Sequence, residues 1–180
     1  MPRTYEPIAS QTLANSTTAT VTFSSLSGNY TDLVCLMSLR TTTGTFNFSG
    51  YAWWRANSDS GTNYSYTALY SRSSAGSWSA LSTRESNLTY GIIGAVVDPS
   101  TNSDIFAPVT LHLMSYANTN VNKTALSTSG FSSNLTNHDG PRRDVSLWRS
   151  TSAITSLTFG LVNGNFVSGS TISIFGVRAA

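Results

Sequence analysis

The sequence predicts an all-β protein: an antiparallel β-sandwich, jelly-roll-like, with about nine strands. Apolar and polar residues alternate along many short segments, which is the pattern of strands with one buried and one exposed face. Clusters of Gly, Ser and Asn separate these segments, as turns do. No segment shows a convincing period of 3.6 residues. Many short, evenly spaced strands are typical of sandwiches, barrels and jelly rolls, and the even spacing favours a jelly-roll-like sandwich.

The composition indicates one domain with a sizeable core. The chain has 180 residues, a length that single all-β domains often reach. Charged residues make up only 10% of it, below the ~25% of an ordinary soluble domain, whereas Ser and Thr together make up roughly 30%. The outer faces of the strands therefore carry hydroxyls rather than charges. Such a surface suits a protein that is partly covered in an assembly.

Residues 1–16 are expected to form an extended N-terminal arm, with a single β-sandwich domain over residues 17–180. Pro2 and Pro7 lie close together, and each removes a backbone donor and restricts the residue before it. Two interpretations remain open. The segment is either a disordered terminus or an arm that docks on a neighbouring subunit through Tyr5, Pro7 and Ile8.

The first strands are expected over Thr17–Phe23, Leu33–Leu39, Thr45–Trp54 and Asn87–Val97. The second of these is apolar on both faces, which marks a central strand. The third includes Phe46 and Phe48 in phase. The segment Asn57–Ala80 is too long for a simple hairpin turn, and such a loop is usually functional or itself partly ordered.

Five further strands complete the predicted sandwich. Three are expected around Ile105–Leu113, Lys123–Thr128 and Asp144–Arg149, and two within Thr151–Ala180. Near the end of the chain the apolar alternation changes phase at residues 175–177. This change predicts either a bulge at Gly176 or a last strand that is buried on both faces.

No catalytic signature is present, and we expect neither enzymatic activity nor a cofactor. His138 and Asp139 belong to a turn sequence, and serines are so numerous that one lies near any His–Asp pair by chance. No G-x-S-x-G motif singles out a nucleophile. The eight acidic residues leave few pairs for glycoside chemistry.

Metal, membrane and nucleic-acid binding are not indicated either. Asn57 begins a spacing like that of a calcium loop, but its twelfth residue is Ala68 rather than Glu. His112 lies mid-strand without a second ligand at metal spacing. Cys35 lies in an apolar run and is expected to be a buried, inert thiol. The net charge of +2 is small and unclustered, and no apolar run is long enough to span a bilayer.

Aromatic residues crowd one quarter of the chain, among them Trp53, Trp54, Tyr64, Tyr66 and Tyr70. About half of them are expected to pack in the core or an interface. Exposed members would stack on sugar rings or anchor an interface, where aromatic residues are enriched. The run of residues 142–144, Arg-Arg-Asp, is interpreted as a charge cluster in a loop. Such clusters are most often solvated, but arginine is also the usual charged residue of interfaces.

Several stretches of the chain resemble stretches found in a known protein family. They are Thr4–Ala9, Val21–Gly28, Tyr30–Leu33, Gly61–Ser65, Leu147–Ser150 and Gly169–Val177. In these turn-and-strand phrases the chain is similar to small bacteriophage virion proteins, known chiefly from phages of aquatic bacteria, cyanobacteria among them. The resemblance implies a structural protein of the phage particle. Its expected partners are further copies of itself, with a trimer preferred, and other virion proteins.

Two locations of the protein in the phage particle are considered. A capsid decoration (cement) protein would bind the major capsid protein on the outside of the head, whereas a tail-fibre tip would bind a host surface glycan. A fibre needs a long shaft or an anchoring domain, and the first strand of this chain is expected near Thr17. Twelve extended residues span up to roughly 40 Å, enough for an arm that reaches a neighbouring capsid subunit. Decoration is therefore favoured.

Overall fold

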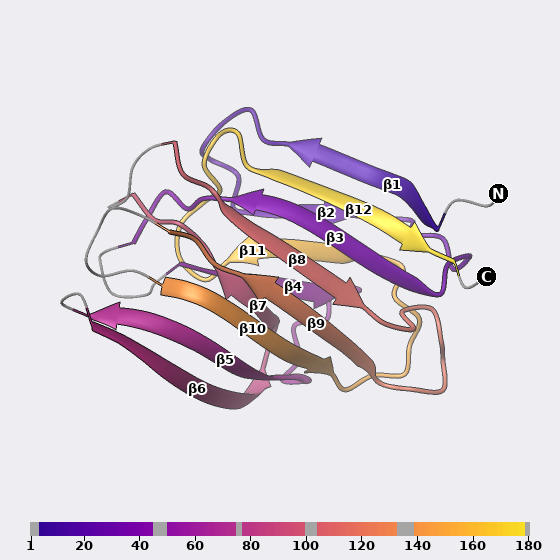
Figure 1. The fold of residues 1–180 in the computed structure, drawn as a ribbon. Helices are drawn as coiled ribbons and strands as arrows, with labels where there is room; N and C mark the ends of the chain where they lie inside the picture. The colour runs from indigo at the N-terminus through magenta and orange to yellow at the C-terminus, as the bar shows by residue number, and fades with distance from the viewer. Residues whose placement is uncertain (1–3, 45–49, 75–76, 100–103, 133–138, 179–180) are drawn as a thin grey trace.

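The structure is a computed structural model that describes residues 4–44, 50–74, 77–99, 104–132 and 139–178. The described residues form twelve strands and no helix, in two antiparallel sheets (Figure 1). The described residues contain no helix that is long and apolar enough to cross a membrane. The strands are β1 (Tyr5–Thr12), β2 (Thr20–Phe23), β3 (Asp32–Leu39), β4 (Tyr51–Ala56), β5 (Tyr64–Ser74), β6 (Ser77–Leu88), β7 (Gly91–Ala95), β8 (Ala107–Leu113), β9 (Lys123–Ser129), β10 (Asp139–Trp148), β11 (Leu157–Leu161) and β12 (Thr171–Val177).

The strand order is that of a jelly roll with additions. The large sheet has the order β1-β12-β3-β8-β9-β10-β5-β6, and the small sheet has the order β2-β11-β4-β7. Four strands of the large sheet, β1-β12-β3-β8, and the whole small sheet make the eight-stranded double layer of a jelly roll. The strands β9 and β10 and the hairpin β5–β6 extend the large sheet (Figure 1). The predicted antiparallel sandwich is confirmed, with twelve strands rather than about nine.

The N-terminal segment is a strand of the large sheet rather than a free arm. β1 pairs antiparallel with β12, beginning with Tyr5 opposite Val177. Pro7 does not prevent this pairing, because β1 is an edge strand and needs backbone donors on one side only. The ladder also shifts register between Pro7 and Ala9, as at a bulge. Tyr5 and Pro7 are exposed, and Ile8 packs against the core, so the expected boundary between arm and domain is wrong.

The last strand keeps its phase to the end. Ile174 and Gly176 both face the core, and the register of β12 with β3 is regular. The apparent change of phase arises because the ring of Tyr30 lies against Gly176, in the space that a larger side chain would fill. Phe175 and Val177 consequently point away from the core. The bulge expected at Gly176 is not found.

The segment expected to be a long loop contains two strands. β5 and the first four residues of β6 lie there, and the two strands form a hairpin that continues to Leu88. β6 is exposed along most of its length. The strand expected over Asn87–Val97 is divided between the end of β6 and the short strand β7. Phe46 and Phe48 lie outside the described residues, and β4 begins at Tyr51.

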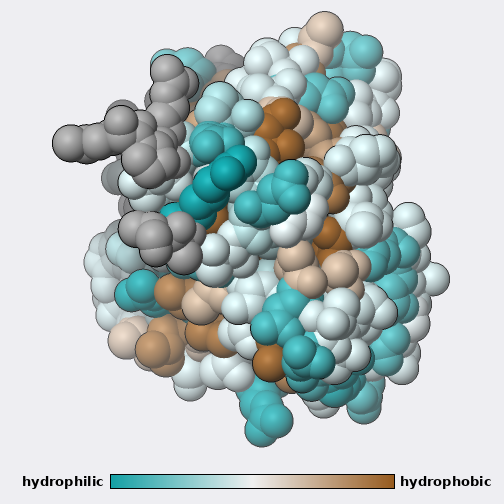
Figure 2. All heavy atoms as spheres, turned by 90° about the vertical axis from the view of Figure 1, so that its right-hand side faces the viewer, coloured by the Kyte–Doolittle hydropathy of each residue, from teal (hydrophilic) through white to brown (hydrophobic). Residues whose placement is uncertain are grey.

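Most of the surface at the end of the molecule seen in Figure 2 is white or pale, the hydropathy of Ser, Thr and Gly. Small apolar areas are interspersed among these residues. The view agrees with the low charge of the sequence.

Cys35 lies in the core between the sheets and has no exposed surface. Burial raises the pKa of its thiol to about 12. Because the thiolate is the reactive species, we expect a disulfide reagent at pH 8 to leave the folded protein unlabelled and to label one thiol per chain in guanidinium. Labelling of the folded chain as fast as a free thiol would contradict this placement.

Candidate functional site

Two of the predicted binding aromatics are core residues. The Trp54 ring lies between the sheets, where its Nε1 donates a hydrogen bond to Ser146 Oγ at 2.9 Å. Tyr64 packs edge-on against it, with 5.8 Å between the ring centroids. The Tyr64 hydroxyl accepts a hydrogen bond from the backbone N–H of Ala56 at 3.0 Å. Trp54 and Tyr64 are both fully buried, so the expectation that they bind a partner is wrong.

Trp53 points to the opposite face of the small sheet. It pairs with Gly160 across the β4–β11 ladder, and its ring lies over that glycine. Tyr90 stacks on it at 5.4 Å between centroids, and the Arg55 guanidinium lies 5.0 Å from its centroid. Trp53 is therefore only 8% exposed and cannot offer its own face to a partner.

Arg142 and Asp144 form a buried ion pair on the inner face of β10. Arg142 Nη2 lies 2.6 Å from Asp144 Oδ1, and both side chains are almost fully buried. The guanidinium stacks on the rings of Tyr51, Tyr70 and Tyr66, at 4.7, 5.1 and 5.9 Å from their centroids. Burial raises the pKa of Asp144, against the opposing effect of Arg142. The interpretation of this run as a solvated loop cluster is wrong. The run lies in β10, where Arg142 and Asp144 point into the core and Arg143 points into the solvent.

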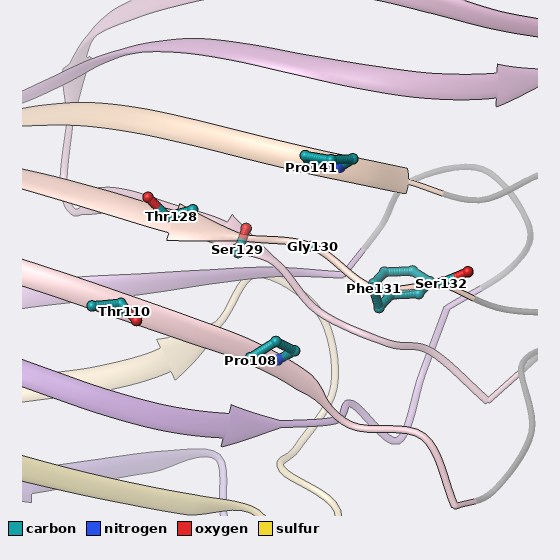
Figure 3. Close-up of a pocket in the computed structure, with 8 residues that line it drawn as sticks. All are labelled: Pro108, Thr110, Thr128, Ser129, Gly130, Phe131, Ser132 and Pro141. Carbon is teal, nitrogen blue, oxygen red and sulfur yellow. The ribbon is translucent and has the colours of Figure 1, made fainter.

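The outer face of the large sheet is hollowed along its width. A pocket of about 460 Å³ lies over β8, β9 and the start of β10 (Figure 3). It shares Thr110 with a second hollow of about 460 Å³ towards β1, and shares Thr128 and Pro141 with a third of about 560 Å³ towards β6. The three hollows therefore border one another and follow each other across the sheet.

This row of hollows has apolar walls at both ends. Its β1 end is lined by Tyr5, Val34, Leu36, Thr110 and Phe175. Its β6 end includes Leu69, which is 65% exposed, and Leu81. We call this surface the outer groove; its lining is completed by Pro108, Thr128, Ser129, Gly130, Phe131, Ser132, Tyr70, Ser71, Ala80, Pro141, Arg142 and Arg143.

The charges beside the outer groove are mainly positive. Arg143 lies opposite Leu69 in the β10–β5 ladder, and Arg84 lies opposite Thr67 in the β5–β6 ladder. Asp32 on the same face already has a partner, since its Oδ2 lies 3.0 Å from His112 Nε2. Exposed apolar side chains with arginine at their border are the composition of a protein-binding surface.

A smaller pocket lies on the inner side of the β5–β6 hairpin. It has a volume of about 140 Å³ and is lined by Tyr51, Tyr66, Glu85, Leu88, Tyr90, Ile92 and Val162. Of the five aromatics singled out in the sequence, only Tyr66 reaches it, while Tyr70 lines the outer groove. Tyr51, Glu85 and Tyr90 were missed because the hairpin that gathers them was not predicted.

The residues considered for chemistry do not form a reactive cluster in the part of the chain that the structure describes. No three His, Cys, Asp or Glu side chains converge there as metal ligands. His112 contacts Asp32 at the sheet surface. His138 and the side chain of Asp139 lie outside the described residues.

No protein-family model matches the chain, and no curated protein matches its sequence. Among solved structures, it is aligned with a protein of unknown function from Shewanella oneidensis MR-1, at 12% sequence identity. The alignment covers 98% of this chain and 77% of the other, with a TM-score of 0.24. A score this low supports no conclusion about fold or function.

Proposed function

We propose that this protein is a non-enzymatic structural protein of a phage virion, located on the outside of the head as a capsid decoration (cement) protein. The outer groove is the surface that would bind the neighbouring virion protein. The virion assignment rests on the resemblance of the strand-and-turn phrases to phage structural proteins. The binding role rests on the outer groove, which crosses the large sheet and has apolar walls at both ends.

The chemistry of the groove supports a protein partner. Leu36 and Leu69 expose apolar surface that a monomer leaves in water, where its burial would be favourable by about 25 cal/mol per Å². Arg84 and Arg143 lie beside it without a carboxylate partner among the contacts described for them. The proposed partner surface is therefore apolar at its centre and carries carboxylates at its rim.

The proposed attachment to the capsid does not use a clamping arm. Since residues 5–12 belong to β1, the proposed contacts of Pro7 and Ile8 with a capsid subunit are replaced by contacts of the sheet face. Tyr5 is retained, because it is exposed and lines the outer groove. Further copies of the chain, with a trimer preferred, are the other proposed partners.

Charge introduced into the outer groove should prevent docking. We expect Leu36→Lys and Leu69→Lys each to weaken binding to capsids assembled without this chain by at least about tenfold, because each buries an unpaired ammonium group. Cosedimentation of the variants with such capsids measures the loss. Val121→Lys is the matched control, since Val121 is exposed to a similar extent but does not line the groove. Equal binding by all three variants would refute the role of the groove.

Copy number separates decoration from the alternative, a tail-fibre or receptor-binding protein. Quantitative gel analysis of purified particles should give hundreds of copies for a decoration protein. A few dozen or fewer would indicate the fibre. Sedimentation of the isolated chain tests self-association, because a monomer has a mass of 19.2 kDa.

A further inference from the structure

The small pocket behind the β5–β6 hairpin has a preorganised wall. Tyr66 lies opposite Glu85 in the hairpin ladder, and its hydroxyl donates a hydrogen bond to Glu85 Oε1 at 2.8 Å. In the turn before β7, the ring of Tyr90 is held by stacking on Trp53, with 25° between the ring planes. The Arg142 guanidinium lies against the rings of Tyr51 and Tyr66. The aromatic side chains of the pocket are therefore fixed by packing before any ligand arrives.

Two hydrogen-bonding groups of this pocket remain open within the described part of the chain. Glu85 makes one hydrogen bond, through Oε1, so its Oε2 is available as an acceptor. The Tyr90 hydroxyl has no hydrogen-bond partner among the described residues, and it can both donate and accept. Leu88, Ile92 and Val162 supply apolar surface between these groups. Few polar groups set in an apolar and aromatic wall are characteristic of small-molecule sites.

We propose that this pocket binds one neutral sugar ring, at the end of a glycan chain. A pyranose has an apolar face that packs on aromatic and aliphatic side chains, and hydroxyls around its edge that donate to a carboxylate. The volume of about 140 Å³ lies below that of sites for drug-sized ligands, ~300–1,000 Å³, and limits the ligand to a single ring. The Tyr90 hydroxyl and Glu85 Oε2 can together accept hydrogen bonds from two hydroxyls on one edge of the sugar.

A quaternary ammonium ion is the main competing ligand, because tyrosines and a carboxylate also attract cations. Such a ligand would leave the Tyr90 hydroxyl and Glu85 Oε2 without hydrogen bonds, since it has no donor. The three aliphatic residues also interrupt the aromatic enclosure that a cation favours. The open hydrogen-bonding groups therefore favour the sugar.

The sugar site is independent of the outer groove. Tyr66 is buried on the inner face of the hairpin, and Glu85, although exposed, lies opposite it on the same face, whereas Leu69 points outward. Variants of the pocket should leave capsid binding unchanged. Failure of the sugar proposal and failure of the docking proposal are therefore distinguishable.

The test uses the full chain and saturation-transfer NMR with neutral hexoses and N-acetylhexosamines, with tetramethylammonium as the competing probe. We expect at least one sugar to bind with a Kd on the order of 1 mM, the range for a ligand of about twelve heavy atoms. Glu85→Ala and Tyr90→Phe should each weaken it by about tenfold, the effect of losing one hydrogen bond to a charged or fixed group. Thermal melting of each variant checks that it folds.

Tyr70→Phe is the matched control for Tyr90→Phe, because Tyr70 lies outside the pocket lining but undergoes the same chemical change. Its sugar affinity should equal that of the parent chain. Three results would overturn the proposal: no sugar binds, only tetramethylammonium binds, or a sugar binds equally well to the Glu85→Ala and Tyr90→Phe variants.

Discussion

Replacing Asp144 by Ala should lower the free energy of unfolding by about 3–5 kcal/mol, the cost of leaving one member of a buried ion pair alone. Asp144 has no exposed surface, and it is bound through both oxygens by Arg142. The variant would leave the Arg142 guanidinium enclosed by tyrosine rings without a counter-ion. Urea denaturation followed by tryptophan fluorescence measures the change.

The double variant Arg142→Met/Asp144→Leu is the control for this prediction. Replacing a buried ion pair by apolar residues of similar size is often neutral or stabilising, so we expect the double variant to be more stable than Asp144→Ala alone. This outcome would assign the loss to the unpaired charge rather than to the cavity. A double variant as unstable as Asp144→Ala would instead show that the tyrosine cluster requires the guanidinium.

The parts of the fold that the apolar pattern could predict are the strands that cover the central core. β3 was predicted to within one residue of its observed start from a continuous apolar run, and β12 lies inside the segment whose alternation predicted it. Both predictions succeed because Leu33, Cys35 and Ile174 face the apolar core. The hairpin β5–β6 was missed for the opposite reason. Its second strand is exposed along most of its length, so its sequence carries no contrast between a buried and a wet face.

The burial of charged residues could not be predicted from the sequence, for a related reason. Arg142 and Lys123 look like ordinary surface residues in the sequence, yet both are buried. Lys123 Nζ donates to the backbone carbonyls of Asn118, Val121 and Thr151, at 2.7, 2.8 and 3.1 Å. These partners come from two separate loops. Only the three-dimensional arrangement brings them to one ammonium group, so no spacing in the sequence reveals it.

The sequence indicated that aromatic residues gather in one part of the chain, but not which of them share a pocket. Aromatic residues were expected to bind a partner, but neighbouring residues of one strand point to opposite faces. Trp53 and Trp54 are therefore enclosed on both sides of the small sheet. Tyr66 alone among the five reaches the small pocket, which is completed by Tyr51 and Tyr90 from the small-sheet side of the chain.

Deleting residues 2–12 should unfold the protein or lower its free energy of unfolding by about 5 kcal/mol or more, a large part of the ~5–15 kcal/mol typical of a domain. The deletion removes β1, which pairs with β12 at seven positions and covers the core with Ile8 and Ala9. It also removes Glu6, whose carboxylate accepts a hydrogen bond from Tyr30 at 3.1 Å and lies 3.3 Å from Arg178. Circular dichroism during thermal melting measures the effect.

Point substitutions on the same strand distinguish a structural strand from a docking arm. Tyr5→Ser and Pro7→Ser change exposed side chains and leave the backbone pairing of β1 in place, so each should alter the free energy of unfolding by less than about 1 kcal/mol. A free arm would give the reverse pattern, in which the deletion leaves the melting temperature unchanged and abolishes only capsid binding. Because the deletion is expected to unfold the sheet, loss of binding by the truncated chain cannot identify a contact. Tyr5→Ser, which stays folded and changes the outer groove, is the variant that can.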